Sequence, residues 1–284
     1  KEIFKYWEGL GYYSRCTNLI AAAKIISTKY KGHFPSSYNE ILALPGIGPY
    51  TAAAISSFAF GLPHAVVDGN VERVLARYFG ITAPVGSVAG KKIYISLAEA
   101  LLDKKAPGIY NQAIMDFGAT ICKPQKPLCN ECVFSRNCQA FQQGWIHELP
   151  VRLTPAARKK RVLYYFIVTA GKDRIWIRKR IESDIWQNLY EFMLWETGKI
   201  IPQHRIKESS FFKEHFGNRG FEIQFISPAF NQILTHQSIT GRFVHISKPL
   251  SKLEGYESVQ QQHLKEYPFP KLLADYIKIL QTRK

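Results

Sequence analysis

Four cysteines crowded into one short stretch are the feature that most restricts how this chain can fold. They have the spacing C-x6-C-x2-C-x5-C and are Cys122, Cys129, Cys132 and Cys138. The 284-residue chain has only 5 cysteines, too few for a disulfide framework, so we expect a reducing, cytoplasmic setting. Four thiolates this close in sequence can converge on one metal centre, and the surrounding loop must fold to let them do so.

The spacing of the cysteines favours an iron–sulfur cluster. Zinc sites made of four cysteines usually carry two tight C-x2–4-C pairs separated by a longer loop. Here only one pair is tight and the connecting loops are short, which is typical of a 4Fe–4S cluster. Zinc and unligated thiols remain as alternatives. A cluster can also hold the loop 122–138 in a shape that presents Lys123 and Lys126 to phosphate.

The two parts of the chain have different patterns, which predict two domains. Residues 1–141 have helical periodicity interrupted by Gly and Pro, and Ser37 with Glu40 forms a capping box. The expected helices there are 51–60, 71–78, 93–102 and 109–121. Residues 142–161 contain prolines and the basic run 158–161, so we predict a linker.

The second part, 162–284, indicates an α+β domain. Strands are expected in 162–170, 174–179, 189–195, 221–225, 232–234 and 241–246, and helices near 205–215 and in 271–280. No apolar run is long enough to cross a membrane. The predicted fold is therefore an all-α domain with a cysteine loop, followed by an α+β domain.

The charge of the chain points to a polyanionic partner. Lys and Arg total 38 against 22 Asp and Glu, which gives a net charge of +16. Phosphate contacts are the natural use of such an excess, although a merely soluble basic protein would have it too.

Two short motifs carry the candidate chemistry. Gly46 and Gly48 allow a tight hairpin between two helices, either an ordinary turn or an anion site at a helix N-terminus. Asp68 stands just before a helix, either as its N-cap or as a carboxylate placed to stabilise positive charge on a sugar.

Together these motifs carry a family resemblance. The hairpin LPGIGPYTA at 44–52, the segment VDGNV at 67–71 and the four cysteines resemble the helix-hairpin-helix DNA glycosylases. The segment LGYYSR at 10–15 and the α+β domain make the chain similar to the MutY-type adenine DNA glycosylases. The resemblance is very specific over 7–138 and weaker over 150–284.

The resemblance implies a repair activity. Its expected reaction is hydrolysis of the N-glycosidic bond of adenine mispaired with 8-oxoguanine or guanine, on a nucleotide flipped out of double-stranded DNA by a monomeric enzyme. Asp68 would stabilise the oxocarbenium-like sugar, and Asn70 would orient Asp68 or a water. Tyr50 occupies the place of the lysine that forms a Schiff base in lyase relatives, so base removal without strand nicking is expected.

The resemblance also implies the DNA contacts. The hairpin residues Gly46, Gly48 and Tyr50 and the loop lysines Lys123 and Lys126 would contact DNA, and Tyr12 would wedge into the duplex.

In the second, Nudix-like domain, Thr235 and His236 would read 8-oxoguanine. The glutamate-rich helix that binds Mg²⁺ in Nudix hydrolases is absent from the sequence, so we expect a reader without hydrolase activity.

The start of the chain departs from the family. It begins at Lys1 inside a helical pattern, and the segment with the general-acid Glu of the family is not in the sequence. We expect a missing N-terminal segment and impaired excision, since general-acid help is worth about 10²–10⁴-fold. Two alternatives remain: an endonuclease III-like glycosylase/lyase, and a non-catalytic DNA protein that binds lesions.

Overall fold

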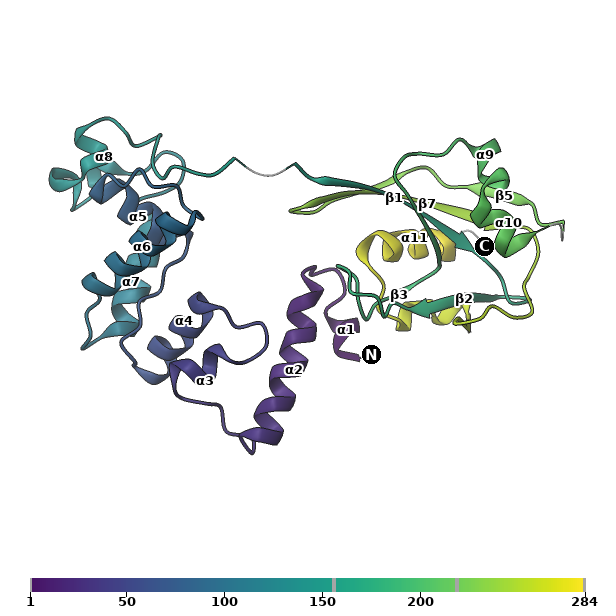
Figure 1. Cartoon of the computed structure of the whole chain (residues 1–284), viewed down its shortest axis with the longest axis horizontal. Helices are drawn as coiled ribbons and strands as arrows, with labels where there is room; N and C mark the ends of the chain where they lie inside the picture. The colour runs from purple at the N-terminus through teal and green to yellow at the C-terminus, as the bar shows by residue number, and fades with distance from the viewer. Residues whose placement is uncertain (1, 155–156, 218–219, 283–284) are drawn as a thin grey trace. The chain divides into compact units, whose positions relative to one another are not determined.

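The computed structural model describes residues 2–154, 157–217 and 220–282 (Figure 1). The chain divides into two compact units. The first, here called the helical unit, is Asn18–Pro155, and the second, the mixed unit, joins Lys1–Thr17 to Ala156–Lys284. The predicted domain limits 1–141 and 162–284 differ from these units at the start of the chain, because Lys1–Thr17 group with the C-terminal residues.

The helical unit has the helices that the apolar periodicity predicts, each beginning earlier than expected. Its elements are the later part of α2 (Tyr13–Lys29), α3 (Tyr38–Leu42), α4 (Pro49–Phe60), α5 (Gly69–Phe79), α6 (Val88–Leu101), α7 (Pro107–Thr120), η1 (Cys129–Glu131), η2 (Ser135–Asn137) and α8 (Gln139–Gln142). Helices α4 and α7 open on prolines, and α5 and α6 follow capping side chains. These first turns lack the apolar stripe on which the sequence prediction depended.

The capping box at Ser37 is confirmed. The Ser37 hydroxyl accepts a hydrogen bond from the Glu40 backbone N–H at 3.4 Å and donates one to the Glu40 carboxylate at 2.6 Å. Helix α3 therefore begins where the sequence pattern placed a helix start.

The mixed unit contains two sheets. The larger has the strand order β4-β1-β7-β5 with β6 also paired to β7, and the smaller has the order β3-β2-β8. Strands β1 and β7 are parallel, and the other neighbouring strands of the two sheets are antiparallel. Their bounds are β1 (Lys159–Ile167), β2 (Arg174–Lys179), β3 (Tyr190–Glu191), β4 (Met193–Thr197), β5 (Ile223–Ile226), β6 (Phe230–Ile233), β7 (Gln237–Ile246) and β8 (Glu257–Gln260).

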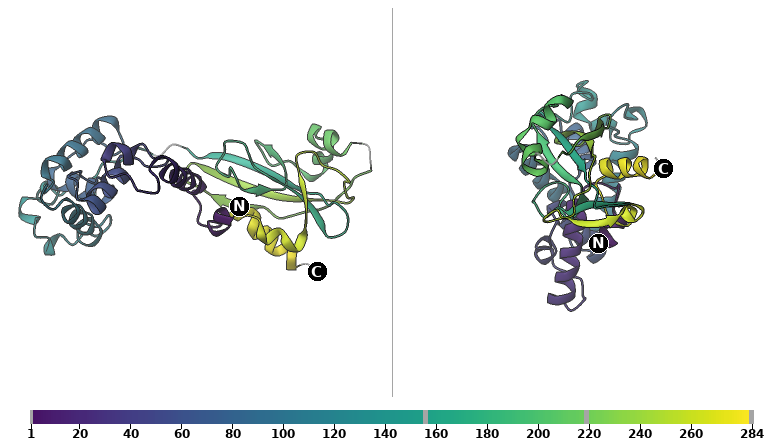
Figure 2. Two further views of the ribbon diagram at one scale, coloured as in Figure 1. Left: turned by 90° about the horizontal axis from the view of Figure 1, so that it is seen from below. Right: turned by 90° about the vertical axis from the view of Figure 1, so that its right-hand side faces the viewer.

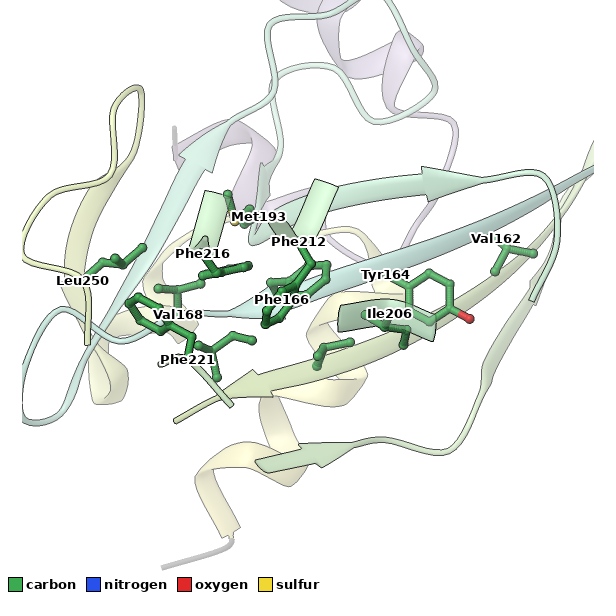
Figure 3. Packing of buried hydrophobic residues seen from close by; sticks show 12 residues of the cluster. Val162, Tyr164, Phe166, Val168, Met193, Ile206, Phe212, Phe216, Phe221 and Leu250 are labelled. Carbon is green, nitrogen blue, oxygen red and sulfur yellow. The ribbon is translucent and has the colours of Figure 1, made fainter. Parts of the chain in front are cut away.

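Helices cover both faces of the larger sheet (Figures 1 and 2). On one face α9 (Gln203–Glu208) and α10 (Ser210–Phe216) bury an aromatic cluster in which Phe212 and Phe216 pack near Phe166 (Figure 3). On the other face α11 (Lys271–Thr282) lies against β7, and Tyr276 stacks on Phe243 with ring centroids 3.7 Å apart. The 3-10 helix η3 (Gln261–Glu266) precedes α11.

The first residues of the chain pack within the mixed unit. Helix α1 (Glu2–Tyr6) is followed by Glu8, whose carboxylate accepts a hydrogen bond from the Phe269 backbone N–H at 3.0 Å. Pairing of this kind, between residues from opposite ends of the chain, is not visible in a local sequence pattern.

The expectation of a linker over 142–161 is wrong at its C-terminal end. Lys159, Lys160 and Arg161 belong to β1, and Arg161 is 7% exposed and paired with Asp184 and Glu196. Their charges suggested a solvent-exposed linker, but these residues form hydrogen bonds with strand β7. A partner strand so far away in the chain cannot be identified from the local sequence.

At its N-terminal end the predicted linker belongs to the helical unit. The Leu149 carbonyl accepts a hydrogen bond from Arg77, and the Val151 carbonyl accepts one from the Val85 backbone N–H. In the parts of the chain that the structure describes, no helix is long and apolar enough to span a membrane.

Candidate active site and cysteine loop

Asp68 is the N-cap of α5, and both of its carboxylate oxygens accept hydrogen bonds at the start of that helix. Its Oδ1 accepts hydrogen bonds from the backbone N–H groups of Asn70 and Val71, both at 2.8 Å, and its Oδ2 accepts one from the Asn70 side-chain amide at 2.9 Å. The side chain is half-buried, so it keeps access to solvent. The capping interpretation is confirmed, and the same contacts hold a carboxylate in one orientation at a helix N-terminus.

Arg73 holds Asn70, the residue whose side chain in turn orients Asp68. Its guanidinium donates to Asn70 Oδ1 at 2.8 Å, so the Asn70 amide is held by Arg73 on one side and by Asp68 on the other. The same guanidinium donates to the carbonyls of Gly118 and Cys122, each at 2.7 Å, and Arg73 is 4% exposed. The end of α7 and the start of the cysteine loop are thus tied to the geometry of Asp68.

The segment that leads into Asp68 is held by two side chains that the sequence reasoning missed. Asn111 of α7 accepts a hydrogen bond from the Val66 backbone N–H at 3.1 Å and donates to the His64 carbonyl at 2.9 Å. Glu99 of α6 accepts from the Ala65 backbone N–H at 3.0 Å. The available signal was a carboxamide inside an apolar helical stretch, because a buried amide must find hydrogen-bond partners.

A second carboxylate lies close to Asp68. Burial raises the pKa of Glu72, the negative charge of Asp68 raises it further, and Lys91 and Arg152 oppose the shift. Burial, followed by the charge of Glu72, also raises the pKa of the neighbouring Tyr94. Glu72 is therefore a carboxyl group whose environment disfavours its charged form.

The glycine hairpin precedes α4. Gly46 has φ +78°, and a Cβ there would lie 2.6 Å from the Cβ of Asn18, so no larger residue fits. Gly48 is the N-cap of α4 and contributes no side-chain cap, and a Cβ added to it would meet open space. Tyr50, in the first turn of α4, is 47% exposed.

The four cysteines of the loop line one cavity. Apolar residues complete its wall, among them Ile121, Leu128 and Ile146, together with Cys122, Cys129, Cys132 and Cys138. Burial raises the pKa of the Cys129 thiol, and the other three thiols raise it further, which places all four sulfurs in one neighbourhood. No group of three or more His, Cys, Asp or Glu side chains among residues 2–154, 157–217 and 220–282 is arranged to hold a metal ion.

Arg77 anchors the start of this loop to α5. Its guanidinium donates to the Lys123 carbonyl at 2.7 Å, to the Pro124 carbonyl at 3.2 Å and to the sulfur of Cys122 at 3.5 Å. Lys123 is half-buried and Lys126 is exposed, with φ +49°. Of the two loop lysines predicted to contact phosphate, Lys126 has the more accessible side chain.

A larger apolar cavity of about 470 Å³ lies between α5, α7 and the loop, lined by residues such as Leu75, Phe117 and Phe134. Its lining contains one charged side chain, Arg77, and no carboxylate. The candidate chemistry of the helical unit therefore stays with Asp68.

The remaining predicted residues belong to the mixed unit. Tyr12 is 65% exposed with φ +47°, and Tyr13 is 5% exposed, so only the first of the two adjacent tyrosines faces solvent. Thr235 and His236 form the exposed turn between β6 and β7, closed by a hydrogen bond from the Leu234 N–H to the Gln237 carbonyl at 2.8 Å.

Sequence comparisons identify relatives of both units. A helix-hairpin-helix motif profile matches residues 29–58, and a NUDIX domain profile matches 164–278. An adenine DNA glycosylase of Buchnera aphidicola subsp. Schizaphis graminum is 36% identical over 204 residues, which cover 69% of this chain and 56% of the relative. The human adenine DNA glycosylase is 44% identical over 144 residues, 50% of this chain and 26% of the relative. The chain spans about half the length of the Buchnera relatives that it matches.

Among solved structures, a non-covalent complex of endonuclease III with DNA has 29% sequence identity and a TM-score of 0.41. The match covers 48% of this chain and 62% of that one.

Proposed function

Because this chain belongs to the adenine DNA glycosylase family, we propose that it removes adenine from double-stranded DNA by hydrolysing the N-glycosidic bond, opposite 8-oxoguanine or guanine. This would be a base excision repair reaction on chromosomal DNA inside the cell, carried out by a monomer. The observation that carries the proposal is Asp68, a solvent-accessible carboxylate fixed by three hydrogen bonds at a helix N-terminus.

Asp68 is suited to stabilise the positive charge that develops on the sugar as the base leaves. Hydrogen bonds that already hold a charged group need no reorganisation in the transition state, which is the source of electrostatic catalysis. Asn70 would keep the carboxylate oriented, because its amide is itself fixed between Asp68 and Arg73. The acid that protonates the departing adenine is not assigned to a residue of this chain.

We test this role with Asp68→Asn in single-turnover assays on a duplex with adenine opposite 8-oxoguanine. Asparagine keeps a capping oxygen, so the fold should persist while excision falls by about 10²-fold or more, as when a stabilising electrostatic group is removed. The control is Asp103→Asn, which changes an exposed carboxylate whose Oδ1 accepts from the Lys105 N–H. Equal excision by Asp68→Asn and the control would remove the catalytic assignment.

Tyr50 supports base removal without strand cleavage. A phenol cannot form the imine through which lyase enzymes nick the strand, since that step needs an amine nucleophile. We expect abasic DNA as the product and no covalent enzyme–DNA adduct on treatment with borohydride. An adduct in high yield would instead favour the endonuclease III-like glycosylase/lyase.

The four loop cysteines would hold a 4Fe–4S cluster. The apolar cavity that all four line and the spacing with one tight pair support this proposal, which requires the four thiols to converge further than they do in this structure. A cluster bound there would supply structural rigidity to the loop. Arg73 and Arg77 would then connect a rigid loop to α5. An iron content near four per chain would support the cluster, and one zinc ion per chain would contradict it.

DNA contacts would come from both units. In the helical unit the N-terminus of α4, which follows Gly46 and Gly48, suits a backbone phosphate. Tyr50 and the loop lysines Lys123 and Lys126 would make further contacts with DNA. In the mixed unit Tyr12 would wedge into the duplex.

Thr235 and His236 would distinguish 8-oxoguanine from guanine. Both lie on an exposed turn, and together they offer a hydroxyl and an imidazole that can donate or accept. The double substitution Thr235→Ala/His236→Ala should reduce the preference for adenine opposite 8-oxoguanine and leave excision opposite guanine intact. An unchanged preference would place the reading residues elsewhere.

A non-catalytic lesion-binding protein is the second candidate function. It is favoured if the chain binds the 8-oxoguanine duplex tightly and selectively, yet releases no adenine during a prolonged single-turnover assay.

A further inference from the structure

The basic segment Arg158–Lys160 lies beside the turn of Thr235 and His236. Strand β1 begins within this segment and runs parallel to β7, with Lys159 paired to Gln237, the residue directly after the turn. The Lys159 backbone N–H also donates to the His236 carbonyl at 2.9 Å. The start of β1 and the start of β7 therefore lie at the same end of the sheet (Figure 1).

The three cations are available for a ligand. Arg158, Lys159 and Lys160 are exposed, and none forms an ion pair with any residue that the structure describes. The next cation, Arg161, differs, because it is buried and neutralised by Asp184 and Glu196. Since consecutive side chains of a strand point to opposite faces, Lys159 and Lys160 place positive charge on both faces of the sheet next to the turn.

Pairing with β7 gives these charges a fixed position. In a flexible linker the same residues would attract phosphate without any set register. In β1 the backbone of Lys159 and Lys160 pairs with β7, and the Lys159 N–H donates to the His236 carbonyl, so these two residues have a set register next to the turn; Arg158 directly precedes them.

We propose that Arg158, Lys159 and Lys160 bind the DNA backbone phosphates that flank the nucleotide contacted by Thr235 and His236. The inference rests on the proposed function, because it takes that turn as the part of the chain that meets the opposite base. Phosphate contacts position a protein on DNA and base contacts specify the sequence, so the strand would anchor the duplex while the turn reads it.

The test is equilibrium binding of the full chain to three duplexes at about 50–200 mM salt, the range over which phosphate contacts change affinity most visibly. The duplexes carry adenine opposite 8-oxoguanine, adenine opposite guanine, or only normal pairs, and fluorescence anisotropy reports binding. The variant is Arg158→Gln/Lys159→Gln/Lys160→Gln.

The matched control removes the same charge elsewhere in the mixed unit, with Lys172→Gln/Lys213→Gln/Lys252→Gln. These three lysines are exposed; Lys172 and Lys252 follow the C-terminal ends of β1 and β7, and Lys213 lies in α10. Excision of the same duplexes is measured on the same samples.

The strand variant should bind all three duplexes about tenfold or more weakly, by the same factor, and its slope of log K against log salt should fall by about 2–3. Each single substitution should lower the slope by about 1. A strand variant that matches the control variant in affinity and slope overturns the inference, and so does a loss confined to the 8-oxoguanine duplex. If the unaltered chain excises nothing while the strand variant still loses affinity uniformly, the proposed reaction fails and the anchoring role is supported.

Discussion

Arg73 is the side chain on which the geometry around Asp68 depends most. Its guanidinium reaches Asn70, Gly118 and Cys122 at once, and it is almost fully buried. A planar fork with several fixed donors can satisfy such diverging acceptors, and an ammonium group cannot. The orientation of the candidate catalytic carboxylate is thus set by a residue one turn further along α5.

Arg73→Lys should therefore lower the free energy of unfolding by about 2–3 kcal/mol, because buried carbonyls lose charge-assisted hydrogen bonds. It should also slow single-turnover excision without weakening duplex binding, since Asn70 would no longer be fixed. Urea denaturation and the excision assay check this, with Arg136→Lys on the exposed cysteine loop as the control. Equal stabilities for the two variants would show that the guanidinium fork is dispensable.

Glu72 makes folding depend on pH. Its pKa in the folded chain lies above the ordinary value of 4.5, because burial and the charge of Asp68 disfavour the carboxylate. The folded state then binds the proton more tightly than the unfolded state, so this group's contribution to stability is present below pH 4.5 and is lost as the pH rises through the folded pKa.

Glu72→Gln should remove the loss of stability that ionisation of Glu72 causes as the pH rises. The variant and the unaltered chain should unfold at the same temperature below pH 4.5, and the variant should unfold at a higher temperature at neutral pH. Thermal unfolding across this pH range measures the difference. A variant that is less stable than the unaltered chain at neutral pH would contradict the direction of the shift.

Among the helices, the contact of α5 with α7 determines how the site is assembled. A Cβ on Gly118 of α7 would lie 2.7 Å from the Cβ of Asn70 and 3.0 Å from its carbonyl oxygen. The two helices approach this closely only because the residue at the crossing has no side chain, and the Gly118 carbonyl then meets Arg73.

Gly118→Ala should accordingly destabilise the chain by about 1–3 kcal/mol, the usual cost of overpacking a close contact. Gly69→Ala is the control, because a Cβ there meets nothing within 4 Å and alanine favours a helix. Chemical denaturation of both variants gives the comparison. If Gly118→Ala is as stable as Gly69→Ala, the helices can separate without cost and the close approach is not required.

At the scale of the whole molecule, the two units have different means of stabilisation. The mixed unit has an aromatic core on one face of its larger sheet and α11 on the other. The end of the helical unit is a loop with little regular structure, whose backbone is held by Arg73 and Arg77 and whose four cysteines line one cavity. Loss of a bound cluster should then act on one unit only.

If the four cysteines hold the proposed cluster, its removal should raise amide hydrogen exchange in 121–142 and in α5, and leave exchange in 159–217 and 220–282 unchanged. The reason is that Arg73 and Arg77 connect the loop to α5 through its backbone carbonyls. Exchange measured by mass spectrometry before and after cluster loss gives the result. Uniform loosening of both units would mean that the cluster stabilises the chain as a whole.

Much of this molecule follows from local sequence. The helical periodicity of apolar residues and the capping box at Ser37 predict helices, because each depends only on a few neighbouring residues. The predicted roles of Asp68, the glycine hairpin and the four cysteines likewise come from short motifs and their spacing.

Only the tertiary structure decided which distant residues serve those motifs. Asn111 of α7 holds the segment before Asp68 and Arg73 of α5 reaches the end of α7, while the residues from Lys159 onward form a strand because β7 pairs with them. Hydrogen bonds between segments far apart in the chain depend on where folding brings them, and a local pattern contains no record of that placement.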